Sequence, residues 1–356
     1  MKKVVLFFAL AVGLLTSAST LQAQTVNMSR YITLTVKKDS AIRLDLKVAA
    51  TNTPVRIVSG SNTQDITVGT GWTGYRNYTA GSTTMTVYGD IISFDCSGNI
   101  TKVTAIDVSH NTQLTYLDCS SNPLSSLDVS KNTQLTTLIC SNNRLTSLDV
   151  SKNTQLEILD CYSNQLTSLD VSKNTQLTYL NCSSNPLSSL DVSKNTQLKR
   201  LWCYNNKFTT AALDDIYCAL PNRTGKEYGV IYPVYNSSSS NHATVLATNA
   251  ANATAKNWKV QYSDGNVNIT TTGSYVCGTP HTDIAEAAAE QALTLYPNPV
   301  ADVLYLSSTA RTIRVYNIDG IEVAHATDTD RIDVASLPAG VYTVKAHGTV
   351  AKMVKR

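Results

Sequence analysis

The sequence has 356 residues, enough for two or three domains, and 15% of its residues are charged. Its formal net charge of +3 at pH 7 is too small to indicate binding to nucleic acid or to an anionic membrane surface. No block of like charges forms a basic arm, so a charged tail of the nucleic-acid-binding kind is also excluded.

The first residues have the pattern of an export signal. Lys2 and Lys3 precede an apolar run over residues 4–15, and a short polar stretch over 16–24 follows it. This order predicts a secretory signal peptide over residues 1–23, cleaved after Ala23. A membrane anchor is the less favoured alternative, because the apolar run is short for a spanning helix. We therefore expect an exported chain without a transmembrane span.

Residues 24–90 alternate between apolar and polar side chains, as over 32–36 and 42–46, with glycine-rich turns over 69–74. Alternation of this kind predicts β-strands. We interpret this region as an N-terminal β cap for the segment that follows, since the open end of a repeat array exposes its core.

A repeat dominates the middle of the chain. The unit L-x-x-L-x-C-x-x-N-x-L-x-x-L-D-V-S-K-N-T-Q starts at Leu114, Leu135, Leu156 and Leu177, a period of 21 residues. A degenerate copy precedes these at residues 91–113, and a sixth copy begins at Leu198. One such unit cannot bury its own apolar residues, whereas stacked units bury them together. The pattern predicts a mainly β solenoid of six coils over residues 91–208.

The same pattern resembles the leucine-rich-repeat superfamily, and within it the Cys-containing 21-residue repeats of internalin J-like bacterial surface proteins. The resemblance implies a fold in which short strands line a concave face that binds partners.

One asparagine of each unit is expected to have a structural role, because its amide can bond backbone groups of adjacent coils at the turn after the strand. These residues form an expected asparagine ladder: Asn99, Asn122, Asn143, Asn164, Asn185 and Asn206.

Six of the eight cysteines occupy one repeat position: Cys96, Cys119, Cys140, Cys161, Cys182 and Cys203. We interpret them as small apolar core residues. Disulfides between coils are less favoured because neighbouring parallel side chains fit the required dihedral poorly. A metal site would need further ligands beside the ladder, and a catalytic thiol would need a base; His110 is expected on the opposite side of the coil.

The residues that vary between repeats alternate outward on the strands, and we predict that they bind partners. The predicted partner-binding set is rich in aromatic residues, as binding hot spots are: Tyr116, Asp118, Ile139, Ile158, Asp160, Tyr162, Tyr179, Asn181, Arg200, Trp202 and Tyr204. The alternative is drift among repeats without selection for binding.

The convex segment L-D-V-S-K-N-T-Q is identical in four units, which suits a scaffold. Its stacked Asp128, Asp149, Asp170 and Asp191 raise the question of calcium, but the alternating lysines could offset the repulsion and the glycine spacing of calcium-binding solenoids is absent.

Residues 209–279 are interpreted as a C-terminal cap with a short helix over 211–220. Cys218 and Cys277 lie outside the ladder and are either a disulfide of an exported protein or two separate thiols. A polar, alanine-rich linker is expected over residues 280–291.

Residues 292–356 form short strands at 303–306, 313–317, 321–324 and 341–346, with turns at Asp319-Gly320 and 338–340, which predict a small β-sandwich. The segments YPNP, RVYNIDG and IDVASLPAGVY and the basic end KMVKR resemble the C-terminal sorting domain of type IX secretion substrates. The resemblance implies recognition by the export machinery and attachment at the cell surface. A purely structural sandwich is the alternative.

Together these features predict a secreted or cell-surface adhesin that binds a protein or glycan partner, on host or neighbouring bacterial cells, through its concave face. A passive surface coat is the alternative, and a hydrolase with a site in the caps is a more distant one. No catalytic motif is present, so we expect no enzyme activity, no catalytic residues, no metal and no cofactor.

Overall fold

The computed structural model describes residues 25–279, 295–318, 321–346 and 349–356. The predicted signal peptide (1–23), the linker (280–291) and the turn Asp319-Gly320 therefore lie outside the described residues. The chain divides into two compact units, residues 1–279 and 280–356. Each unit is described by itself.

A five-stranded antiparallel sheet begins the first unit. Its order is β4 (Asn62–Val68), β3 (Thr53–Ser59), β6 (Thr84–Tyr88), β1 (Tyr31–Val36) and β8 (Val103–Asp107). Strand β8 comes from the stretch read from the sequence as the first coil, yet it pairs with β1. The pairing supplies partners for the backbone groups on that edge of β1, so the cap and the first coil share hydrogen bonds instead of dividing cleanly at residue 90.

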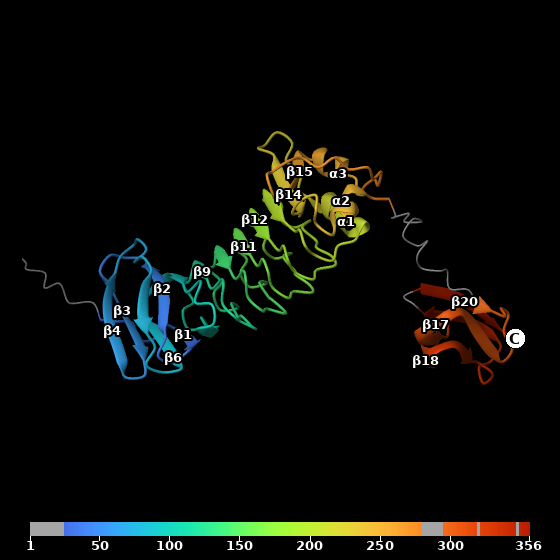
Figure 1. Cartoon of the computed structure of the whole chain (residues 1–356), viewed down its shortest axis with the longest axis horizontal. Coiled ribbons are helices and arrows are strands. Elements are labelled where there is room, and N and C mark those ends of the chain that lie inside the picture. The colour runs from blue at the N-terminus through green and yellow to red at the C-terminus, as the bar shows by residue number, and fades with distance from the viewer. Residues whose placement is uncertain (1–24, 280–294, 319–320, 347–348) are drawn as a thin grey trace, which may run out of the picture. The chain divides into compact units, whose positions relative to one another are not determined.

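The second sheet has ten strands and runs through the repeats (Figure 1). Its order from the N-terminal end is β5 (Arg76–Thr79), β2 (Ala41–Val48), β7 (Ile91–Asp95), β9 (Tyr116–Asp118), β10 (Thr137–Ile139), β11 (Ile158–Asp160), β12 (Tyr179–Asn181), β13 (Arg200–Trp202), β14 (Gly229–Val234) and β15 (Trp258–Tyr262). From β7 to β15 every pairing is parallel, while β2 and β5 close the N-terminal end in antiparallel fashion.

The repeat leucines line up as the 21-residue period predicts. Leu117, Leu138, Leu159 and Leu180 are register partners on adjacent strands, and each is fully buried. Burying one such side chain is worth about 1.5–3 kcal/mol, a gain that each coil obtains from its neighbours. The predicted leucine-rich-repeat fold is confirmed. The parallel sheet also extends by two strands, β14 and β15, into the region interpreted as a cap.

The predicted asparagine ladder makes the expected bonds. Asn143 Nδ2 donates to the carbonyl oxygens of Cys119 in the preceding coil, at 3.1 Å, and of Cys140 in its own coil, at 3.0 Å. Its Oδ1 accepts from the backbone N–H of Leu124 at 3.0 Å. One amide thus satisfies buried backbone groups of two coils.

A second asparagine ladder, which the sequence reading treated as plain convex scaffold, lies in the turn S-K-N-T-Q. Asn153 Nδ2 donates to the carbonyl oxygens of Val129 and Asn132, both at 2.9 Å, and its side chain is fully buried. The same bonds recur one coil apart at Asn132, Asn174 and Asn195. Each coil is therefore tied to its neighbour on both sides of the hydrophobic core.

The convex aspartates form turns within their own coils. Asp149 Oδ1 accepts from the backbone N–H of Ser151 at 2.8 Å, and Asp128, Asp170 and Asp191 do the same two residues ahead. These bonds lower the pKa of Asp149, and the neighbouring Lys152 adds a smaller effect of the same sign.

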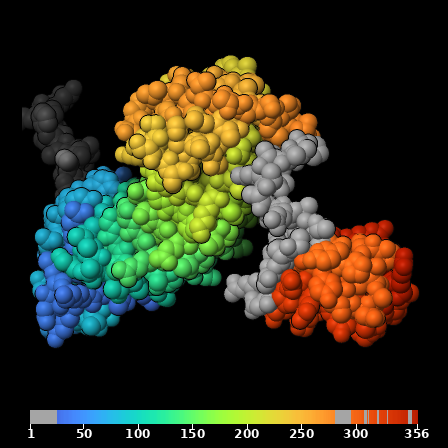
Figure 2. Space-filling model, turned by 45° about the vertical axis from the view of Figure 1, so that its right-hand side comes forward, coloured from blue at the N-terminus to red at the C-terminus, as the bar shows by residue number. Residues whose placement is uncertain are grey.

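Three helices cover the C-terminal end of the repeats: α1 (Thr210–Ala219), α2 (His242–Leu246) and α3 (Ala251–Thr254). Figure 2 shows the repeats as one continuous surface between this cap and the N-terminal sheet. Helix α1 starts at the N-cap Thr209, whose hydroxyl accepts from Ala212 N–H.

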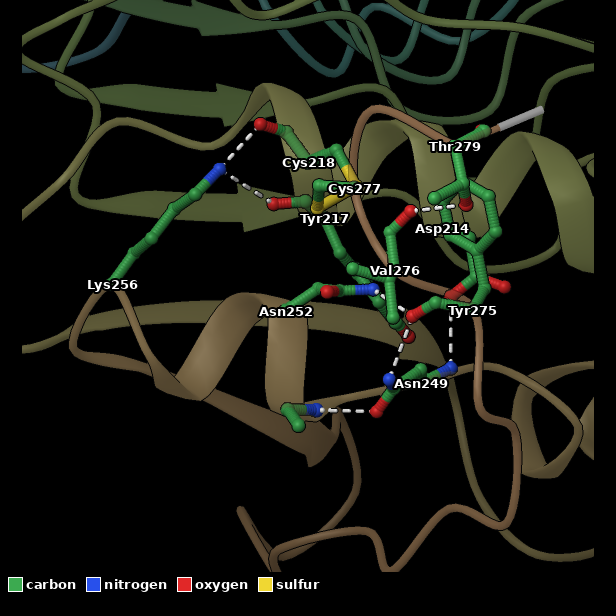
Figure 3. Close-up of a disulfide and its surroundings, with 11 residues drawn as sticks. Asp214, Tyr217, Cys218, Asn249, Asn252, Lys256, Tyr275, Val276, Cys277 and Thr279 are labelled. Atoms are coloured by element: carbon green, nitrogen blue, oxygen red, sulfur yellow. Dashed lines mark hydrogen bonds between the residues drawn. A yellow bond between two sulfur atoms is a disulfide. The ribbon is translucent and has the colours of Figure 1, made fainter. Parts of the chain in front are cut away.

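Cys218 and Cys277, 59 residues apart, form a disulfide that ties α1 to the end of the first unit (Figure 3). Beside it, Asn249 and Asn252 donate to the Tyr275 carbonyl oxygen at 2.7 and 2.8 Å. The ammonium of Lys256 donates to the Cys218 carbonyl oxygen.

The second unit consists of β16 (Leu295–Tyr296), β17 (Val303–Tyr316), β18 (Glu322–Asp333), β19 (Gly340–Ala346) and β20 (Thr349–Lys355). The two ends of β17 have different neighbours on one side, β16 at the first end and β19 at the second, while β18 pairs along its other side, so the five strands belong to one sheet. The two strands expected at 303–306 and 313–317 are thus one strand. Asn298 of the YPNP segment bonds Lys352 O and Val354 N–H, both at 2.8 Å, which fixes the basic end as β20.

Candidate binding surface

The outward face of the ten-stranded sheet carries one row of side chains in register across eight strands. We call it the central row, and its members in spatial order are Asp45, Asp95, Asp118, Ile139, Asp160, Asn181, Trp202 and Tyr232. Successive strands of a sheet lie about 4.8 Å apart, so the row is a continuous strip and not a set of scattered residues.

The C-terminal end of the central row is aromatic. The ring of Trp202 lies 4.7 Å from Tyr179 and 4.8 Å from Tyr232, measured between centroids. A second line runs beside it, in which Tyr204 lies 6.4 Å from Tyr162 and 5.5 Å from Tyr235. We call these six residues the aromatic half. Burial raises the pKa of Tyr179 to about 12, so its hydroxyl stays protonated and can donate a hydrogen bond.

A groove of about 870 Å³ opens beside three rings of the aromatic half, and its lining residues include Tyr179, Arg200, Trp202, Tyr228, Tyr232 and Gln261. Arg200 is exposed, and the ammonium of Lys259 lies 3.7 Å from the centre of the Tyr228 ring. The groove thus combines flat apolar surface with cations and amides, a composition suited to binding a partner.

The N-terminal end of the central row is acidic and is partly roofed by the segment between β4 and β5. Thr73 Oγ1 donates to Asp45 at 2.8 Å, and the Tyr75 hydroxyl donates to Asp95 at 2.8 Å. Trp72 meets Tyr116 edge-on at 5.2 Å between ring centroids. Asp45 and Asp95 are buried as a result.

Asp118 and Asp160 remain half-buried on the open face, on either side of Ile139. Burial raises the pKa of Asp118, and the carboxylates of Asp95 and Asp160 raise it further. Burial likewise raises the pKa of Asp160. Like charges on neighbouring strands repel one another and destabilise a sheet. These carboxylates therefore lower the stability of the fold, as expected of residues kept for binding a partner.

All eleven residues predicted to bind partners lie on β9–β13 or within two residues after these strands, on the outward face. The structure brings Tyr179 to Trp202 and Tyr162 to Tyr204, whereas Tyr116 lies at the other end of the face with Trp72. Their part in binding stays a prediction.

Sequence reasoning missed the aromatic residues that the caps add to this face. Trp72 and Tyr75 come from the glycine-rich turn of the N-terminal cap, and Tyr228, Tyr232 and Tyr235 come from the C-terminal cap. The repeat pattern stops short of them. The continuous apolar run over 229–234, which is β14, was the available signal.

The six ladder cysteines are fully buried and unpaired with one another by disulfides. Burial raises the pKa of every one of these thiols, which keeps them protonated and poor as nucleophiles or metal ligands. Over residues 25–279 and the described parts of the second unit, no group of three His, Cys, Asp or Glu side chains has the arrangement of a metal site. In the same residues no helix is long and apolar enough to cross a membrane.

Two family models match the chain. Residues 133–174 match the model for leucine-rich repeats in two copies, and residues 294–356 match the secretion system C-terminal sorting domain. A comparison with curated proteins finds no match.

Solved structures with similarity to this chain include three repeat proteins. One, from Listeria monocytogenes, is described as the functional domain of InlJ, which includes a cysteine ladder; it is 20% identical over 74% of this chain and 76% of its own, with a TM-score of 0.34. The internalin InlF of the same species is 18% identical over 52% and 62%, with a TM-score of 0.31. A leucine-rich-repeat protein of Leptospira interrogans is 19% identical over 35% and 38%, with a TM-score of 0.27.

The expected combination of leucine-rich repeats followed by a secretion-system C-terminal sorting domain is confirmed by the two family models and by the stacked 21-residue coils. The sorting domain implies export, with the protein at the cell surface or outside the cell. Leucine-rich repeats of this kind typically bind proteins.

Proposed function

We propose that this chain is a non-catalytic surface adhesin whose concave face binds a protein or glycan on host or neighbouring bacterial cells. The observation that carries the proposal is the aromatic half: two groups of three rings in contact on the outward sheet face, one of which, Tyr179, Trp202 and Tyr232, lines a groove that also holds Arg200. Trp, Tyr and Arg are the residue types that dominate binding energy at interfaces.

The exposure of Tyr179 and Trp202 supports binding because these two rings lie outside the hydrophobic core. The inward residues Leu180 and Leu201 are fully buried, whereas Tyr179 and Trp202 are only half-buried on the opposite side of the same strands. A fold that needed only a solenoid could place small or polar residues there, as other coils do with Thr137 in the row of Tyr179 and Asn181 in the row of Trp202.

The proposal is tested with the full chain on an array of purified matrix proteins and of glycans, and with bacterial and epithelial cells. We expect the double variant Tyr179→Ala/Trp202→Ala to lose its array ligand by about 30-fold or more, since truncating a hot-spot residue costs about 2 kcal/mol. The melting temperature should fall by only about 2–4 °C, because neither ring is fully buried.

The matched control is Lys173→Ala/Lys194→Ala, two exposed residues in the convex turns of the coils at 156–176 and 177–197. It should bind as the wild type does. Retained binding by the aromatic variant would refute the concave face as the binding surface, and an array without any ligand would favour a passive coat. Turnover in a broad hydrolase screen would refute the non-catalytic assignment.

A further inference from the structure

The charge on the concave face changes from acidic to basic along the solenoid. Its acidic end holds Asp118 and Asp160 on the open part of the central row. Its opposite end holds Lys199, Arg200 and Lys259 around the groove, against one carboxylate, Glu227.

The cations near the acidic end lie beyond Asp118. Arg43 places its guanidinium 3.9 Å from the centre of the Tyr75 ring and donates to the Ser97 carbonyl oxygen at 3.1 Å. Lys47 on β2 is the register partner of Ser93 on β7. Both lie at the first strands of the sheet, beside the buried Asp45 and Asp95, so Asp118 and Asp160 repel each other without a cation between them.

From this arrangement we infer that the partner is a protein segment crossing the strands in one direction, with two Lys or Arg side chains on Asp118 and Asp160 and a carboxylate on Arg200. The inference rests on the proposed function. It adds the chemistry and the orientation of the ligand.

The spacing narrows the segment further. Asp118 and Asp160 are two strands apart, about 10 Å, with the apolar Ile139 between them. Arg200 lies two strands beyond Asp160 in the row beside the central row, where its register partner is Tyr179. On an α-helix, residues i, i+7 and i+14 lie on one face at steps of about 10.5 Å, with i+3 and i+4 between them. A helix with cations at i and i+7, leucine at i+3 or i+4 and a carboxylate at i+14 therefore matches the face.

Partial burial of the two carboxylates makes contact with a cation favourable. Asp118 and Asp160 are half-buried, and burial raises the pKa of each, so a cation placed there relieves a repulsion already present in the free protein. Complementary charges of this kind chiefly set orientation and specificity.

The test uses the full chain and an 18-residue alanine-based helical peptide that has Lys at positions 2 and 9, Leu at 5 and 6, and Glu at 16. Two versions carry a nitroxide, one at the lysine end and one at the glutamate end. The readout is the broadening of two indole N–H signals in solution NMR: Trp72, which contacts Tyr116 near Asp118, and Trp202 beside Arg200.

We expect the lysine-end label to broaden Trp72 more than Trp202, and the glutamate-end label to do the reverse. Equal broadening of both signals by either label, or failure of the peptide to bind the wild-type chain at millimolar concentration, would overturn the inference.

The variant Asp118→Asn/Asp160→Asn should weaken peptide binding about three- to tenfold, as partly exposed charge pairs do. Its melting temperature should be equal to or above that of the wild type, which separates loss of the cation site from loss of the fold. Asp149→Asn/Asp170→Asn, on the convex turns, is the matched control and should leave binding unchanged.

The two hypotheses fail separately. If Tyr179→Ala/Trp202→Ala abolishes the array ligand while the peptide shows no orientation, the concave face binds but the inferred charge pattern of its partner is wrong. If the peptide orients as expected while the aromatic variant keeps its array ligand, the central row reads charge but the proposed adhesive surface lies elsewhere.

Discussion

The concave and convex sides of the repeats obey different rules although one 21-residue unit builds both. The convex turns are identical in sequence in four units, and two side chains of each turn bond the backbone: Asp149 accepts from Ser151, and Asn153 bonds two carbonyls of the coil before. The outward strand positions differ from coil to coil: Asp118 and Asp160 accept from the backbone N–H two residues ahead, as Asp149 does, whereas Ile139 in the same row has no side-chain acceptor. Identity therefore marks the turns that carry the asparagine ladder between coils, and variety marks the strand face where side chains meet solvent or a partner.

The strongest test of this difference is the second asparagine ladder. Asn153→Ala removes two hydrogen bonds and leaves the carbonyls of Val129 and Asn132 buried without that donor. We expect a loss of about 2–4 kcal/mol in the free energy of unfolding, measured by urea denaturation. The exposed neighbour Thr154 is the control, and Thr154→Ala should change stability by less than about 0.5 kcal/mol. Equal effects at the two positions would contradict the ladder.

The cysteine ladder should respond less strongly. Cys140→Ser places a hydroxyl in a fully buried apolar position, and we expect a loss of about 1–2 kcal/mol. Because burial raises the pKa of the Cys140 thiol, the folded chain should also resist maleimide, with labelling appearing together with unfolding in a urea series. Rapid labelling of the native protein would show that the ladder is accessible.

Substitution of an aspartate on the convex side should change the pH dependence of stability in the opposite sense to substitution on the concave side. Hydrogen bonds from Ser151 lower the pKa of Asp149, so its contribution to stability is present above the ordinary Asp pKa of 3.8 and is lost as the pH falls. We expect Asp149→Asn to melt slightly below the wild type at pH 7 and level with it in acid. Melting curves from pH 7 to pH 3 measure this.

Asp118 on the concave side should give the smallest effect, with the reverse sign. Its raised pKa means that the stability associated with its protonated form is present below pH 3.8 and is lost as the pH rises through the folded-state pKa. Asp118→Asn should therefore equal or exceed the wild-type melting temperature at pH 7, and the difference should vanish in acid. A clear loss of stability at pH 7 would show that Asp118 serves the scaffold.

The sequence predicts the solenoid well because its signal is repeated. Leu117 and its equivalents recur at a fixed interval, and their burial needs no information beyond that interval. It predicts the candidate surface in part: Tyr179 and Trp202 follow from strand alternation. The roof formed by Trp72 and Tyr75 does not, because a contact between a cap turn and a distant coil leaves no periodic trace.

The same limit explains why the pairing of β8 and of β14 was not predicted from the sequence. Both depend on which exposed strand edge lies nearby, and that is a property of the assembled fold. The second ladder was missed for another reason: an Asn within a hydrophilic turn looks solvent-exposed until the neighbouring coil covers it, as happens at Asn153.

The strict register of the parallel sheet has an evolutionary consequence. Residues 114–134 and 177–197 differ at one position, where Asp118 corresponds to Asn181. Because each coil bonds to its neighbours through the same atoms, duplication or deletion of a whole unit in the coding sequence leaves every junction intact. Such a gene can lengthen or shorten its product in steps of one coil, and each new copy then supplies outward positions on which selection can act.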